Sequence, residues 1–154
     1  MLNVKKYTAF ILLAGLAVSA GFSPASEPVY DERADAGKAI KAAAAEASRA
    51  GKRIVLVFGA NWCKDCRGLD SQMHKGELAS LLEKSFVVVK IDVGRMDKNV
   101  EVAKKYGVPV DNGIPALAVL DAKGKLLYAQ DQGQFASARS MSHESIRAFF
   151  EQWK

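Results

Sequence analysis

The chain has 154 residues but only two cysteines, two histidines and no apolar run of membrane-spanning length. Two cysteines are too few for the several disulfides that usually hold small secreted domains together. His74 and His143 do not stand at zinc-finger spacing from the cysteines, and two thiolates alone leave a zinc site incomplete. The apolar stretch at residues 8–18 is shorter than the roughly 20 residues that a spanning helix needs. These shortages argue against a disulfide-stapled domain and a zinc finger.

Charge is spread along the chain. The formal net charge is +5, but no run of five or more basic residues occurs. Two of the 22 basic residues, Lys5 and Lys6, fall in the N-terminal leader described next. Binding to nucleic acid normally leaves a clustered basic patch, so the sequence predicts no nucleic-acid partner. A hydrophobic content of 49% at this length favours one compact domain.

The first 20 residues have the three parts of a secretory signal peptide. A basic start is followed by the apolar stretch at residues 8–18 and by small residues that end at Ala20. We expect cleavage after Ala20, with Ala25 as the second choice. An uncleaved membrane anchor is the alternative. The leader over residues 1–20 therefore predicts export to the periplasm or another secreted location.

The rest of the chain divides into a tail and a folded domain. Residues 21–34 contain two prolines and several charges without a periodic pattern, which predicts a flexible N-terminal tail. Residues 35–154 show alternating helix and strand patterns. Parallel strands joined by helical crossovers, with an antiparallel pair at one edge, predict an α/β sandwich of three layers. In chain order we predict a helix from Asp35 as N-cap to Arg49 that Gly51 closes, a strand over 53–58, a helix over 63–73, a short helix with Leu78, Leu81 and Leu82, a strand over 86–93, a helix over 97–106, a loop over 108–114, a hairpin of strands 116–120 and 125–129, a polar stretch over 130–141 and a helix over 142–153.

Cys63 and Cys66 lie between a predicted buried strand and a predicted helix. Cys63 then stands at the helix N-terminus, with Cys66 one turn later on the same face. Unpaired backbone N–H groups and the positive end of the helix dipole favour a thiolate at the first position. A disulfide over so short a loop constrains the unfolded chain little, so a purely structural role is the weaker alternative. The pair predicts a reversible redox site, with metal binding as another alternative.

Three segments carry a resemblance to a known family. They are FGANWCKDCR at residues 58–67, VKIDV at residues 89–93, and GIP at residues 113–115, followed by a strand and a Gly-centred hairpin. Together they resemble the thioredoxin superfamily over most of residues 35–154. The Trp-Cys-x-x-Cys form with a leader is most similar to exported, periplasmic-type thioredoxin-like proteins. The resemblance implies a thioredoxin-like three-layer α/β/α sandwich with a mixed central sheet.

The resemblance also implies roles for single residues. Cys63 is the expected nucleophile, and Cys66 resolves the mixed disulfide that Cys63 forms. Pro115 is expected to follow a cis peptide bond, which places Ile114 next to Cys63 and exposes backbone groups for an extended substrate. Trp62 is expected to form an apolar surface beside the reactive sulfur, with plain packing of a large aromatic side chain as the alternative.

The two residues between the cysteines are expected to tune the redox potential. Lys64 favours the neighbouring thiolate, whereas the Asp65 carboxylate opposes it, so the sign of their combined effect stays open. The alternative is that both side chains point into solvent and contribute little.

The chain departs from the family pattern in two places. Thioredoxins carry a buried aspartate six residues before the first cysteine, and here that position is Val57. Asp92 is the carboxylate that we consider as a substitute for this acid. The segment at residues 108–113 is also longer than in a minimal thioredoxin, which predicts a different substrate groove.

The sequence as a whole predicts a thiol–disulfide oxidoreductase that exchanges disulfides with protein substrates. We expect it to act as a reductant or in support of isomerisation, as a monomer, without an organic cofactor or a metal. A reductant in an oxidising compartment needs an electron source, so a membrane electron-transfer donor or acceptor is a predicted partner. The alternative is a non-catalytic binding module or metal carrier with the same fold.

Overall fold

The computed structural model describes residues 27–154. The predicted leader at residues 1–20, both cleavage sites and the first part of the predicted tail lie outside these described residues. Among residues 27–154, no helix has the length and apolar character needed to cross a membrane.

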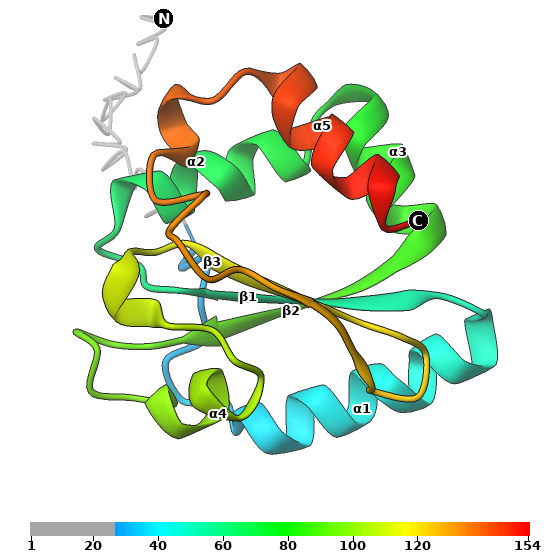
Figure 1. Cartoon of the computed structure of the whole chain (residues 1–154), viewed down its shortest axis with the longest axis horizontal. Helices are drawn as coiled ribbons and strands as arrows, with labels where there is room; N and C mark the ends of the chain where they lie inside the picture. Colours follow the sequence, from blue (N-terminus) through cyan, green and yellow to red (C-terminus); the bar gives the residue numbers. More distant parts are fainter. Residues whose placement is uncertain (1–26) are drawn as a thin grey trace, which may run out of the picture.

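A four-stranded sheet forms the middle layer (Figure 1). Its strands stand in the order β2-β1-β3-β4, with β1 parallel to β2 and antiparallel to β3, and β4 antiparallel to β3. The predicted mixed sheet with its hairpin at one edge is therefore confirmed. The strands are β1 (Arg53–Gly59), β2 (Phe86–Asp92), β3 (Ala116–Leu120) and β4 (Leu126–Ala129).

Helices cover both faces of the sheet, which confirms the three-layer sandwich (Figure 1). One face carries α1 (Ala36–Ala50) and α4 (Val100–Lys105). The other face carries α2 (Lys64–Met73), α3 (Gly76–Ser85) and α5 (His143–Gln152). Strand β1 is apolar throughout because its alternate side chains enter both cores: Ile54, Leu56 and Phe58 pack towards α1, and Val55 and Val57 towards α2 and α5.

Helix α1 begins and ends where its capping residues predict. The Asp35 carboxylate accepts a hydrogen bond from the Lys38 backbone N–H at 3.0 Å. Gly51 closes the helix with a φ of +65°, a left-handed conformation that glycine adopts without steric cost. Buried alanines such as Ala43 and Ala47 pack this helix against the sheet.

The helix predicted over 97–106 starts later than expected, at Val100. The Val93 carbonyl accepts hydrogen bonds from the backbone N–H groups of Met96, Asp97 and Lys98, at 2.8 to 3.3 Å. These bonds fold the segment after β2 into tight turns, and Asn99 has a φ of +50°. The chain is therefore still turning at the position where apolar spacing predicts the first helical turn.

Candidate functional site

Cys63 and Cys66 lie where β1 gives way to α2. Cys63 is the N-cap of α2, and its Sγ accepts a hydrogen bond from the Cys66 backbone N–H at 3.1 Å. The two sulfurs form a disulfide, with the Cα atoms 5.2 Å apart. The predicted placement, at the helix N-terminus with the second cysteine one turn on, is confirmed. An acceptor at this position is stabilised by the free N–H groups of the first helical turn.

Ile114 lies directly beside Cys63. Its carbonyl oxygen is 3.6 Å from the Cys63 Sγ, and the Ile114–Pro115 peptide bond is cis. The structure thus brings together residues 51 positions apart in sequence, as the resemblance predicts. Cys63 and Ile114 each keep 6% of their surface exposed, whereas Cys66 keeps 1%. Cys63 is therefore the more exposed of the two cysteines.

Trp62 is a surface residue. Its side chain is 48% exposed, its Nε1–H donates to the Gly94 carbonyl at 2.7 Å, and the Arg95 guanidinium lies 5.6 Å from the ring centroid. The Trp62 ring is therefore not part of the buried core. The indole ring is exposed, is fixed by its hydrogen bond to Gly94, and is next to the disulfide in sequence. It is therefore available for contact with another molecule.

Lys64 and Asp65 differ in their surroundings. Lys64 is exposed, but the Asp65 carboxylate accepts the Arg139 backbone N–H at 3.0 Å and lies 3.8 Å from the Arg139 Nε. The segment at 130–141, predicted only as a polar stretch, therefore returns to the start of α2. Sequence reasoning missed Arg139, because nothing in the local pattern links it to a residue 74 positions earlier.

Val57 occupies the position of the missing aspartate and is buried among apolar residues. In the β1–β2 register, Val57 stands beside Lys90 and Gly59 beside Asp92. Neighbouring side chains in paired strands project from the same face of a sheet, so Lys90 and Asp92 lie on the α2 side. Lys90 forms an ion pair there with Asp70 of α2.

Asp92 is 4% exposed, and its Oδ2 lies 3.4 Å from the Lys98 Nζ. This oxygen accepts no hydrogen bond from the described residues. A buried carboxylate is thus present near the cysteines. It stands on β2, whereas the family pattern places its aspartate on β1, at the position of Val57.

Tyr30 is a site residue that sequence reasoning missed. It falls in the segment predicted as a flexible tail, yet it is 1% exposed. Asn61 holds it with two hydrogen bonds of 2.9 Å, since the Tyr30 N–H donates to the Asn61 Oδ1 and the Asn61 Nδ2 donates to the Tyr30 carbonyl. A lone aromatic among prolines and charges carries no periodic signal, so the sequence pattern did not anticipate this anchoring.

The Tyr30 hydroxyl and the Cys66 sulfur both lie close to Gly59. A Cβ on Gly59 would overlap the hydroxyl and lie 2.9 Å from the Cys66 Sγ. Burial, and then the negative charges of Asp70 and Asp92, raise the pKa of Tyr30 well above its ordinary value. The hydroxyl therefore stays protonated in the folded protein and is available as a hydrogen-bond donor.

The raised pKa of Tyr30 predicts a loss of stability in alkali. The unfolded chain releases the phenolic proton as the pH rises through about 10, whereas the folded chain keeps it. The unfolded state then binds fewer protons, so the free energy of unfolding falls by about 1.4 kcal/mol between pH 9 and pH 11. Urea unfolding of the wild type and Tyr30→Phe across this range measures the effect. The variant should lose less stability than the wild type, and parallel curves would contradict the prediction.

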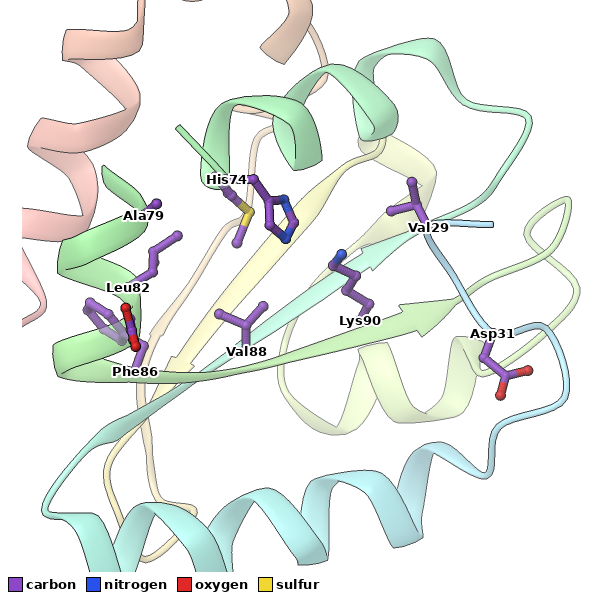
Figure 2. A pocket seen from close by; sticks show the side chains of 10 residues that line it. Val29, Asp31, His74, Ala79, Leu82, Phe86, Val88 and Lys90 are labelled. Atoms are coloured by element: carbon purple, nitrogen blue, oxygen red, sulfur yellow. The ribbon is translucent and has the colours of Figure 1, made fainter. Parts of the chain in front are cut away.

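A separate pocket of about 640 Å³ lies beside the outer edge of β2 (Figure 2). Val29 and Asp31 of the N-terminal segment border it at one end, and Leu82 and Phe86 at the other. Neither the cysteines nor Trp62, Ile114 or Pro115 line it, so this pocket is not the cavity of the candidate site. No three His, Cys, Asp or Glu side chains among the residues that the structure describes are placed to hold a metal ion.

Comparison with known proteins gives a family and several structural neighbours. Residues 35–122 match the sequence model of a family described as thioredoxin-like. The chain is 45% identical to the disulphide isomerase from Xylella fastidiosa Temecula1, covering 84% of this chain and 98% of that one with a TM-score of 0.80. A search of curated proteins found no match.

Two further structures share the fold at lower identity. The oxidised C-terminal domain of DsbD from Neisseria meningitidis is 21% identical over 79% of this chain and 97% of that one, with a TM-score of 0.57. A thioredoxin from Thermus thermophilus is also 21% identical, over 73% and 82% of the two chains, with a TM-score of 0.55.

Proposed function

We propose that this chain, which belongs to the thioredoxin-like family and is a thiol–disulfide oxidoreductase, exchanges disulfides with protein substrates through Cys63 and Cys66. The observation that carries the proposal is the placement of the Cys63 sulfur. It stands at the start of α2, accepts an N–H hydrogen bond, and lies 3.6 Å from the Ile114 carbonyl oxygen. We further propose a role as a reductant or isomerase in an exported compartment, which the similarity to a disulphide isomerase supports.

The exchange runs in two steps. The Cys63 thiolate attacks one sulfur of a substrate disulfide, forms a mixed disulfide, and expels the other substrate sulfur as a thiolate. The Cys66 thiolate then attacks the Cys63 Sγ, which breaks the mixed disulfide and releases the second substrate thiolate. Two electrons pass from the protein dithiol to the substrate, whose thiolates take up two protons. The same steps in reverse oxidise a substrate dithiol.

Substrate binding is proposed for the surface around the Cys63 sulfur. An extended substrate segment would pair with the backbone at Ile114 and Pro115, in the manner of an added strand. The exposed Trp62 ring borders this place and would cover the apolar part of the substrate. Protein disulfides or dithiols fit such a surface because recognition through the backbone tolerates many sequences.

Lys64 is proposed to affect the reduction potential of the cysteine pair more than Asp65 does. Arg139 lies beside Asp65 and offsets its negative charge, whereas the exposed Lys64 retains its positive charge next to Cys63. The balance favours the Cys63 thiolate and so moves the pair towards a more oxidising potential. About 30 mV corresponds to a tenfold change in the equilibrium constant of this couple.

The direction of electron flow is proposed to depend on a partner. A reductant in an oxidising compartment must be recharged, and a membrane electron-transfer protein is the proposed donor for a monomer exported by the leader. The second candidate function is a binding module or metal carrier that uses the same surface without exchange chemistry. The greater exposure of Cys63 than of Cys66, together with its place at the start of α2, favours exchange over this candidate.

Trapping of substrates tests the proposal. The chain is expressed with its leader as Cys66→Ala, and mixed disulfides at Cys63 are sought on non-reducing gels. We expect trapped protein partners that disappear in the Cys63→Ala/Cys66→Ala control. The absence of trapped partners, together with no reduction of insulin by the wild type, would favour the binding module. A reduction potential near −270 mV would indicate a reductant, and one near −120 mV an oxidant.

A further inference from the structure

Gly59 creates a shared space beneath the disulfide. This residue ends β1, and its missing Cβ leaves room into which the Tyr30 hydroxyl and the Cys66 sulfur both reach. Both side chains are 1% exposed, so bulk water has little access to this space. Cys66 therefore needs a protein group to stabilise a negative charge on its sulfur.

The segment that supplies Tyr30 precedes the part of the chain that matches the family. The match begins at residue 35, and Tyr30 reaches the site because Asn61 binds its backbone N–H and carbonyl. Asn61 stands two residues before Cys63, so the same loop that presents the cysteine also fixes the tyrosine. This arrangement brings a hydroxyl group to the space at Gly59 that the Cys66 sulfur also borders, from a segment outside the residues that match the family.

The charged groups around this hydroxyl come from α2, from β2 and from the loop after β2. Asp70 of α2 is paired with Lys90 of β2, while Asp92 at the end of β2 lies 3.4 Å from the Lys98 Nζ. The Asp92 Oδ2 accepts no hydrogen bond from residues 27–154, so this buried oxygen is free to accept one. With Val57 in place of an acid, Asp92 is the buried carboxylate that the register places beside Gly59, where the Cys66 sulfur also lies.

We propose that the Tyr30 hydroxyl is a positioning and hydrogen-bonding group for Cys66 in the second exchange step. The Cys66 thiol gives its proton to the Asp92 carboxylate, and the Tyr30 O–H donates a hydrogen bond to the sulfur as it becomes a thiolate. The thiolate then forms its bond to the Cys63 Sγ, the bond between Cys63 and the substrate sulfur breaks, and the electron pair leaves on the substrate thiolate. Tyr30 itself keeps its proton. The inference rests on the proposed disulfide exchange and assigns a residue to its second half.

The two exchange steps separate in a reaction with 5,5′-dithiobis(2-nitrobenzoate). Attack by Cys63 on this disulfide releases a first thionitrobenzoate, and attack by Cys66 on Cys63 releases the second. In Tyr30→Phe, which keeps the ring, we expect the second release to slow about tenfold and its pH midpoint to rise by about one unit. The first release should stay within about twofold of the wild type, because Cys63 keeps its N–H donor.

Matched variants separate the hydroxyl from general effects. Tyr128→Phe removes a hydroxyl on β4, away from the cysteines, and should leave both releases unchanged. Asn61→Ala, which removes the two hydrogen bonds that hold Tyr30, should slow the second release as Tyr30→Phe does. If Tyr30→Phe does not fold, Asn61→Ala still tests the role of the Tyr30 hydroxyl.

Each outcome bears on one claim. A second release unchanged in Tyr30→Phe, or both releases slowed equally, overturns the role of Tyr30 while the disulfide exchange stands. A wild-type protein that shows neither release overturns the proposed exchange itself.

Discussion

Replacing Cys63 with serine should lower disulfide reductase activity to the uncatalysed background, a loss of more than about a thousandfold. The nucleophile in disulfide exchange is a thiolate, and a serine hydroxyl does not ionise near neutral pH. The hydrogen bond from the Cys66 N–H at 3.1 Å would then stabilise a neutral hydroxyl that cannot attack. Cys66 cannot replace Cys63, because its side chain, on the inner side of α2, is almost fully buried. Turnover of insulin, measured by its precipitation, reports the loss.

Cys66→Ser is the matched control for this variant. Both substitutions remove the same disulfide, which contributes about 2 kcal/mol for so short a loop, so they share any loss of stability. Cys66→Ser also abolishes turnover, but it keeps the first step. In a single-turnover reaction with 5,5′-dithiobis(2-nitrobenzoate), it should release one thionitrobenzoate promptly, whereas Cys63→Ser should release none on that time scale. Equal rates in the two variants would show that the assignment of the nucleophile is wrong.

The sequence was most informative where a local rule decides the structure. Asp35 and Gly51 are a good N-cap and a good left-handed residue whatever surrounds them, and the structure uses both as predicted. Strand β1 is apolar on both faces, which only a central strand requires. The spacing of Cys63 and Cys66 depends on one helical turn, so their meeting also follows from local geometry. The start of α4 could not be predicted in this way, because three hydrogen bonds to the Val93 carbonyl compete with the first helical turn.

Some groups of the candidate site could be predicted from the sequence, and others could not. The Ile114 carbonyl could be placed beside Cys63 only through the resemblance to a family, because 51 residues separate the two. Tyr30 and Arg139 could not be placed at all, since each reaches the site through a long-range hydrogen bond and neither stands in a periodic pattern. The absence of the family's aspartate at Val57 was visible in the sequence. Whether Asp92 lies on the same face depends on strand register, which the sequence alone does not determine.

Replacing Gly59 with alanine should destabilise the fold and disrupt the site at once. The new Cβ would overlap the Tyr30 hydroxyl, lie 2.5 Å from the ring carbon that bears it, and lie 2.9 Å from the Cys66 Sγ. Such distances are far below van der Waals contact, and neither neighbour can move into solvent because both are buried. Overpacking of this kind costs about 1–3 kcal/mol in the free energy of unfolding. Urea unfolding of the oxidised protein measures it.

Gly37→Ala is the matched control, because the same added methyl group should raise the stability at this position instead of lowering it. Gly37 lies in the first turns of α1, and its nearest neighbour to an added Cβ is the Asp35 Oδ1 at 3.4 Å, an ordinary contact. Alanine at this helical position should stabilise the protein by about 0.5–1 kcal/mol. The double variant Gly59→Ala/Tyr30→Ala should lose less stability than the two single variants added together, because the ring that the new methyl group would overlap is then absent. A Gly59→Ala variant with wild-type stability, or a double variant whose losses simply add, would show that Tyr30 does not fill the space above Gly59.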